Sequence, residues 1–152
     1  MDRLGRTFLF GDLQWKNVST LADGATQMAA TLANWEFGVV RGPGWLIVKP
    51  IPHGQDPTQS YELAEAVWGL LQQHFVQRLV IEMDQVSFMS SYLIGQLVLL
   101  QKRIHQQGGV LRVCGMSPDC QQAMQLSQLH KLLPNYVDRE QAILGARPTQ
   151  PR

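Results

Sequence analysis

Two adjacent hydroxyl side chains, Ser90 and Ser91, stand where a strand is expected to give way to a helix. A serine at such a junction can cap the helix, because its oxygen accepts a hydrogen bond from a backbone amide of the first turn. A hydroxyl beside these unpaired amides tolerates a phosphate, which the helix dipole stabilises by about 0.3–1 kcal/mol. The added charge would repel a partner that contacts this surface. An ordinary capping pair without a regulatory role is the alternative.

The other residue types that could do chemistry form no catalytic or metal-binding pattern. Glu82 and Asp84 share one face if they lie on a strand, yet no nucleophile or glycine-rich phosphate loop accompanies them. A Walker-type lysine motif, a zinc signature and a nucleophile-elbow serine are missing from the sequence. The histidines, which are scattered, are His53, His74, His105 and His130. We expect no catalytic residue, no metal site and no cofactor.

Composition favours a protein partner and a cytoplasmic location. The chain has 152 residues, the usual size of one domain, with 13 basic and 12 acidic side chains. This balance offers no electrostatic attraction for nucleic acid or an anionic membrane. No segment approaches the ~18 apolar residues of a membrane span, and the first residues do not resemble a secretion signal, so no membrane insertion is expected. Cys114 and Cys120 are expected to be free thiols in a reducing compartment.

Short apolar strands alternate with amphipathic helices from residue 35 onward. This order is typical of a mostly parallel sheet with right-handed crossovers. Residues 41–44, Arg-Gly-Pro-Gly, predict the tight turn of a hairpin, and residues 50–59 predict a loop. The expected strands are 36–40, 45–49, 79–83, 110–114 and 135–137, and the expected helices are 60–74, 90–107, 118–129 and 138–144.

Capping residues and apolar spacing define the helices more closely. Ser60, Ser117 and Asp138 are expected helix caps, and Gly108-Gly109 is expected to end the helix that follows the serine pair. The stripe predicted to bury that helix consists of Leu93, Leu97, Leu100 and Ile104, widened by Ile94, Val98 and Leu99.

Residues 86–97, Val-Ser-Phe-Met-Ser-Ser-Tyr-Leu-Ile-Gly-Gln-Leu, resemble the signature of the STAS domain family. In anti-sigma factor antagonists of that family an apolar strand end is followed by Asp-Ser and by Gly-Leu-Gly entering a helix. Residues 108–113 and 117–133 resemble the segments that follow. The present chain has Ser90 in place of the aspartate and Leu93 in place of the first glycine. The resemblance implies an α/β domain with a mostly parallel sheet of four to five strands, an N-terminal hairpin and three to four helices.

The same resemblance implies a function. Ser91 aligns with the serine that anti-sigma kinases phosphorylate, and Gly95 with the second glycine. The chain would bind a serine-kinase anti-sigma factor, free a sigma factor, and be switched off by phosphorylation of Ser91. The expected partner-binding residues are Met89, Ser90, Ser91, Tyr92 and Gly95. One alternative is a STAS scaffold or transport-accessory module that binds its partner without phosphorylation, and another is a nucleotide-binding or small-molecule-binding STAS domain.

The chain is expected to divide into an accessory arm, a domain and a tail. The arm, residues 1–34, lacks clean periodicity and is either a flexible leader or, because it contains Phe8, Phe10 and Trp15, a segment that docks on the domain or on a second copy. The STAS domain is expected over 35–146, and the tail over 147–152. We expect the protein to be a monomer, or a weak homodimer whose copies contact each other through the arm.

Overall fold

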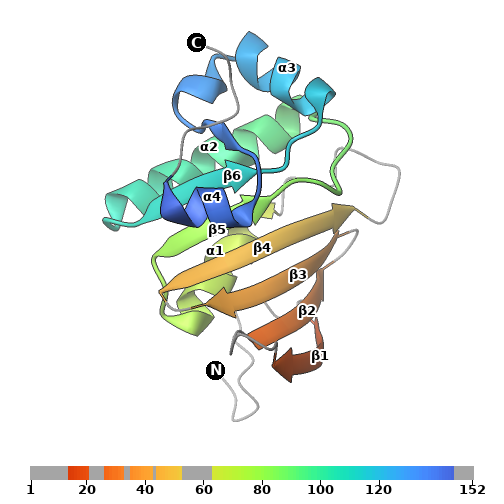
Figure 1. The fold of residues 1–152 in the computed structure, drawn as a ribbon, viewed down its shortest axis with the longest axis vertical. Coiled ribbons are helices and arrows are strands. Elements are labelled where there is room, and N and C mark those ends of the chain that lie inside the picture. Colours follow the sequence, from red (N-terminus) through yellow and green to blue (C-terminus); the bar gives the residue numbers. More distant parts are fainter. Residues whose placement is uncertain (1–13, 21–25, 33–34, 43, 53–62, 146–152) are drawn as a thin grey trace.

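The computed structural model describes residues 14–20, 26–32, 35–42, 44–52 and 63–145 (Figure 1). These residues contain one sheet whose seven strands lie side by side in chain order. The strands are β1 (Gln14–Thr20), β2 (Thr26–Leu32), β3 (Trp35–Gly42), β4 (Trp45–Pro52), β5 (Arg78–Glu82), β6 (Val110–Cys114) and β7 (Asn135–Tyr136). The helices are α1 (Leu63–His74), α2 (Ser91–Gln106), α3 (Pro118–Leu126) and α4 (Arg139–Leu144), with a 3-10 helix, η3, at Leu129–Lys131.

The predicted α/β fold with an N-terminal hairpin is confirmed. Strands β3 and β4 form the hairpin, and Gly44 adopts the positive φ of 76° that its turn requires. The sheet is mixed. Strands β1 to β4 pair antiparallel, whereas β4 to β7 pair parallel, and a helix connects each strand of this parallel part to the next. The parallel part is the alternating strand and helix unit that the sequence pattern indicates.

Two strands extend the sheet beyond the four to five that the sequence predicts. Strand β2 pairs antiparallel with β3 along its length, from Thr26 opposite Arg41 to Leu32 opposite Trp35, and β1 pairs with β2. Part of the expected arm therefore continues the sheet. The expected docking residues Phe8 and Phe10 lie outside the described residues, and the division of the chain at residue 34 stays a prediction.

The main core lies between the sheet and helices α1, α2 and α3. Right-handed crossovers between successive parallel strands place these helices on one face, and α4 covers the other (Figure 1). Alternation along β5 follows this division, because Leu79 and Ile81 enter the main core while Val80 faces α4. Each of α2, α3 and α4 begins a few residues after the end of a strand, and the serine pair lies at the first of these junctions, between β5 and α2.

Arg112 holds α4 against its face of the sheet. Its Nη1 donates to the carbonyl oxygen of Ala142 at 2.7 Å, near the C-terminal end of that helix. Its guanidinium also lies 5.5 Å from the ring centroid of Trp45 and 5.9 Å from that of Tyr136. A cation at a helix C-terminus also complements the helix dipole. Arg112 therefore both packs against the aromatic rings and caps α4.

Several predicted element boundaries need correction. Strand β4 continues to Pro52, three residues into the predicted loop. Helix α3 ends at Leu126 rather than 129, because Gln128 adopts a left-handed φ of 65° and the chain continues as η3. Helix α1 begins at Leu63 among the described residues, and its predicted cap, Ser60, lies outside them.

Both cysteines are free and fully buried. Burial, followed by the charge of Glu82, raises the pKa of the Cys114 thiol to about 12. The Cys120 thiol donates to the carbonyl oxygen of Val86 at 3.4 Å. Only thiolates react readily with alkylating agents, and about one Cys114 in ten thousand is ionised at pH 8.

Native protein is therefore expected to resist alkylation at both cysteines. Incubation with iodoacetamide at about pH 8 should leave the intact mass unchanged, whereas the same treatment in concentrated guanidinium chloride should add two carbamidomethyl groups. Rapid labelling of Cys114 in the native protein, followed by mass spectrometry, would show that its site opens far more easily than its burial indicates.

Candidate functional site

A loop of residues 83–90 connects β5 to α2, and contacts on its buried side hold it in place. The amide of Met83 donates to the carbonyl oxygen of Cys114 at 2.8 Å, and the amide of Val86 donates to that of Met83 at 3.0 Å. Met83, Val86 and Met89 are all buried in the main core. With the thiol of Cys120 bound to the Val86 carbonyl, the loop is held in one position beneath its exposed residues.

Ser90 caps α2, as the sequence predicts. Its φ of −77° and ψ of 164° are extended, and its Oγ accepts a hydrogen bond from the amide of Leu93 at 3.1 Å. The Ser90 carbonyl oxygen accepts from the amide of Ile94 at 3.0 Å, the first bond of the helix ladder. The hydroxyl of Ser90 is thus engaged in holding the helix start, and the residue is half-buried.

Ser91 is the first residue of α2, and it is exposed. A group at this position lies beside the amides of the first helical turn, which is the positive end of the helix dipole. The first turn contains no acidic residue. A phosphate on Ser91 would therefore gain from the dipole without meeting a carboxylate in that turn.

Exposed apolar side chains flank Ser91. Phe88 is 66% exposed, Tyr92 is 54% exposed and Leu99 is 56% exposed. Gly95 lies between Tyr92 and Leu99 at helical spacing, and a Cβ added there would meet no atom within 4 Å. We call the surface formed by Phe88, Ser91, Tyr92, Gly95 and Leu99 the α2 face. An exposed apolar patch of this kind is typical of a surface that contacts another protein.

The structure brings three of the five predicted partner-binding residues to this surface. Ser91, Tyr92 and Gly95 are exposed on the α2 face. Ser90 lies at its edge as the helix cap. Met89 is only 6% exposed and packs in the main core, so it supports the loop from within. Leu93, at the position of the family's first glycine, is also buried, and its bulk does not crowd Ser91.

Phe88 and Leu99 belong to the α2 face, although the sequence analysis did not assign them to it. Leu99 was expected to widen the buried stripe, and this expectation is wrong because its side chain is more than half exposed. The signal was its spacing: Leu99 follows Tyr92 by seven residues and therefore shares its side of the helix. Phe88 had no comparable signal, because it lies in a loop.

Gln96 joins α2 to the start of α1. Its Oε1 accepts a hydrogen bond from the amide of Ala64 at 2.9 Å, which satisfies a first-turn donor of α1 that has no partner within that helix. Gln96 directly follows Gly95, so this hydrogen bond fixes the position of the N-terminus of α1 relative to the α2 face. The contact spans 32 residues of sequence, which is why local patterns gave no sign of it.

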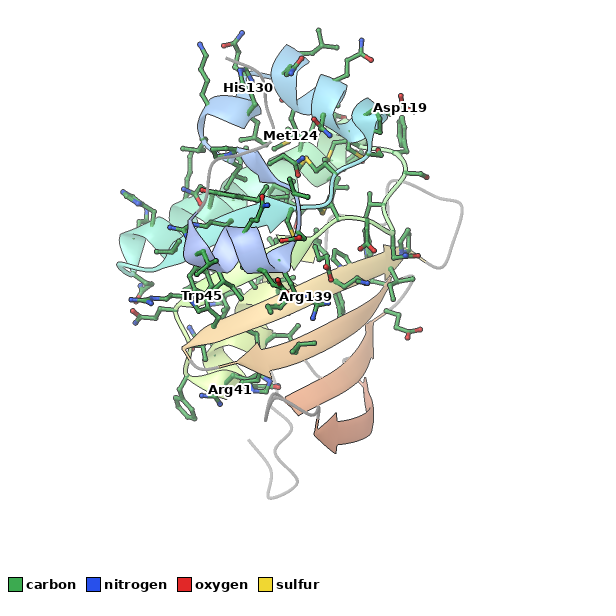
Figure 2. The ribbon with its side chains drawn as sticks, in the orientation of Figure 1. Arg41, Trp45, Asp119, Met124, His130 and Arg139 are labelled. Atoms are coloured by element: carbon green, nitrogen blue, oxygen red, sulfur yellow. The ribbon has the colours of Figure 1, made fainter. Side chains whose placement is uncertain are left out.

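Glu82 and Asp84 form ion pairs, so the presence of two carboxylates at the end of this strand has a structural explanation and needs no acid/base role. Glu82 accepts two hydrogen bonds from Arg139, at 2.7 and 3.3 Å, and lies 3.6 Å from the Lys49 ammonium. Asp84 lies 3.3 Å from the same ammonium. The hydrogen bond with Glu82 raises the pKa of Arg139 above its usual value. Arg139 begins α4 and joins it to the sheet (Figure 2).

The described residues contain neither a metal-binding cluster nor a membrane-crossing helix. No cluster of three or more histidine, cysteine, aspartate or glutamate side chains there has a geometry that could hold a metal ion. None of the helices described is both long enough and apolar enough to cross a membrane.

Comparison with known proteins identifies one family. The model of the STAS domain family matches residues 47–142, well over half of the chain. An anti-sigma F factor antagonist from Paenibacillus polymyxa is 27% identical over 103 residues, which cover 66% of this chain and 85% of that protein. The matched region includes the 83–90 loop and all of α2.

Solved structures share the fold at lower identity. An anti-sigma factor antagonist from Mycobacterium paratuberculosis superposes with a TM-score of 0.60 and 19% identity, covering 85% of this chain and 99% of that chain. The Bacillus cell fate determinant SpoIIAA, in its phosphorylated form, superposes with a TM-score of 0.54 and 18% identity, covering 73% of this chain and 99% of that chain.

Proposed function

Since the chain belongs to the STAS domain family, we propose that it is an anti-sigma factor antagonist that acts by binding a protein partner and not by catalysis. Its relative from Paenibacillus polymyxa carries that description. The partner proposed is an anti-sigma factor with serine kinase activity, bound in the cytoplasm through the α2 face. Binding would occupy the anti-sigma factor and release the sigma factor. The observation that carries the proposal is the exposed Ser91 among exposed apolar side chains.

Phosphorylation of Ser91 is the proposed off switch. In this step the Ser91 hydroxyl loses its proton, its Oγ bonds to the γ-phosphorus of ATP, and ADP leaves with the bridging oxygen. The modified residue gains a charge of about −1.5 to −2 beside Phe88 and Tyr92, where a bound partner would have to remove water from it. The cap made by Ser90 is untouched, so the helix stays formed.

The first test is the site of modification. Incubation with the anti-sigma factor kinase and ATP should add ~80 Da to the wild-type chain, and Ser91→Ala should abolish this gain. Ser87→Ala is the matched control, because it removes an exposed hydroxyl from the loop that precedes α2, and this variant should still accept one phosphate. A gain of the same mass in Ser91→Ala would place the modification elsewhere and remove the proposed switch.

A second candidate function is a STAS scaffold that holds its partner permanently. The exposed ring of Tyr92 beside Ser91 favours it, because an aromatic ring at the centre of an interface stabilises a long-lived complex. The two functions differ in one measurable way: a scaffold would bind Ser91→Asp as tightly as the wild type, whereas the switch would not.

A further inference from the structure

Helix α1 ends in an arrangement that normally requires glycine. The amide of Phe75 donates to the Gln72 carbonyl oxygen at 3.3 Å, and the amide of Val76 donates to that of Leu71 at 3.2 Å, which together form a Schellman motif. Phe75 occupies the left-handed position of this motif, with a φ of 55°. A bulky side chain is disfavoured in this conformation, because its Cβ crowds the following carbonyl group.

Of the other α-helices described, α2 and α4 end in this conformation on a glycine, whereas α3 is followed by Gln128 with a φ of 65°, so Phe75 is the bulkier of two exceptions. Gly108 follows α2 with a φ of 76°, and Gly145 follows α4 with a φ of 71°. Phe75 also has the highest exposed fraction, 93%, among the large apolar side chains that the structure describes. Phe75 therefore costs conformational energy and gains little burial within its own chain. A residue that breaks a local rule in this way indicates a role outside folding.

A cleft opens directly beside this ring. Its volume is about 300 Å³, and Phe75 forms part of its wall. Its other apolar walls come from Trp68, Leu71, Val76 and Ile104, at the C-terminal ends of α1 and α2. A cavity of about 150 Å³ already holds benzene, so the cleft has room for a phenyl ring.

An ion pair lies against Trp68, one of the walls of the cleft. The guanidinium of Arg103 lies 5.0 Å from the ring centroid of Trp68 and donates to the Glu65 carboxylate at 2.9 Å. The remaining polar groups of the lining are glutamine amides, which carry no charge. Burial and the charge of Arg41 lower the pKa of His74, which precedes Phe75, so the positive charge on that side belongs to Arg41. The lining itself contains no ionisable side chain, so two copies that meet here bring no like charges together inside the clefts.

A projecting apolar ring and an adjacent apolar cleft on one patch are self-complementary under a two-fold rotation. We propose that this chain forms a homodimer in which Phe75 of each copy enters the cleft beside Phe75 of the other. An isologous contact of this kind satisfies both clefts at once. The contact is small, so the dimer is weak, with a dissociation constant on the order of 10–100 µM.

The proposed contact leaves the α2 face free. The cleft includes Ile104 and Gln107 at the C-terminal end of α2, whereas Ser91 is its first residue. The 16 residues of that helix span about 24 Å. Each dimer would therefore present two α2 faces, and this conclusion does not depend on what binds there.

Phe75→Gly tests the proposal, because it should change association and stability in opposite directions. In sedimentation equilibrium the wild-type chain should show a monomer–dimer equilibrium, and Phe75→Gly should raise the dissociation constant at least about tenfold, through loss of the buried ring. The melting temperature of the variant should stay level or rise by about 1–4 °C, because glycine suits the left-handed position. A folding defect cannot produce this combination.

Two further variants complete the experiment. Leu126→Ala removes a side chain that is 79% exposed on α3 and should leave the dissociation constant unchanged. Gln107→Trp should weaken association by filling the cleft with a residue of the same chain. A wild-type chain that stays monomeric at several hundred micromolar would overturn the proposal. A dimer that persists in Phe75→Gly would do the same, and would point instead to the N-terminal arm.

Discussion

Replacing Ser91 by aspartate is expected to weaken binding to the anti-sigma factor by at least about a hundredfold, a loss of about 2.7 kcal/mol. The carboxylate would lie on the α2 face among side chains that are more than half exposed in the free chain and would become buried in the complex. Burying a charge without a partner costs several kcal/mol, and the expected loss is a fraction of that cost because some water remains at the edge of the contact.

The same substitution should leave the fold intact. Aspartate at the first position of a helix interacts favourably with the helix dipole, by about 0.3–1 kcal/mol, and α2 has no other acidic residue in its first turn. The Ser90 cap also remains. The free energy of unfolding should therefore stay level or rise slightly while binding falls.

Isothermal titration calorimetry with the purified anti-sigma factor would measure this loss. Gln106→Glu is the matched control, because it adds the same charge to the last turn of α2, away from Ser91, and should change affinity less than about threefold. Ser91→Ala should bind like the wild type. Equal affinity of Ser91→Asp and the wild type would reject the switch and favour the scaffold.

Gly109→Ala is expected to destabilise the fold by about 3 kcal/mol or more. A Cβ at this position would overlap the carbonyl oxygen of Gln77 and lie 2.9 Å from Cγ2 of Ile104. The Gln77 carbonyl cannot move freely, because it accepts the hydrogen bond from the Val110 amide at 2.9 Å that begins the pairing of β5 with β6. Relief of the overlap would separate β5 from β6 at this end of the sheet.

Gly95→Ala is the matched control for this prediction. The added methyl group would lie in open space, and alanine is favoured over glycine inside a helix, so the variant should gain about 0.5–1 kcal/mol. Urea unfolding followed by tryptophan fluorescence gives both values under the same conditions. If Gly109→Ala unfolds at the urea concentration of the wild type, the close approach of α2 to β5 is not required for stability.

Local signals in the sequence were sufficient for the starts of α2, α3 and α4 and for the position of Ser91. Ser90, Ser117 and Asp138 were predicted as caps, and each accepts a hydrogen bond from an amide three residues later. Such a bond depends on neighbouring residues alone, so residue type and spacing predict it. The alternation of strand and helix was visible for the same reason, because each element shows its own apolar period.

Contacts between distant segments could not be predicted in this way. The pairing of Glu82 with Arg139 spans 57 residues, and it turns a candidate acid/base residue into an anchor for α4. The burial of Met89 and the exposure of Leu99 likewise depend on which elements pack over the loop and the helix. An apolar side chain can be buried or exposed, and its residue type alone does not tell which, because this depends on its neighbours in space.

The sequence by itself thus determined the order of the elements from residue 35 onward, the caps and the helix start that carries Ser91. Only the tertiary structure decided that β1 and β2 continue the sheet, that Phe88 and Leu99 are exposed, and that Phe75 stands exposed beside a cleft. The physical reason is range. A cap or an apolar period is set by residues within a few positions, whereas strand pairing, burial and surface shape are set by contacts that only the folded chain brings together.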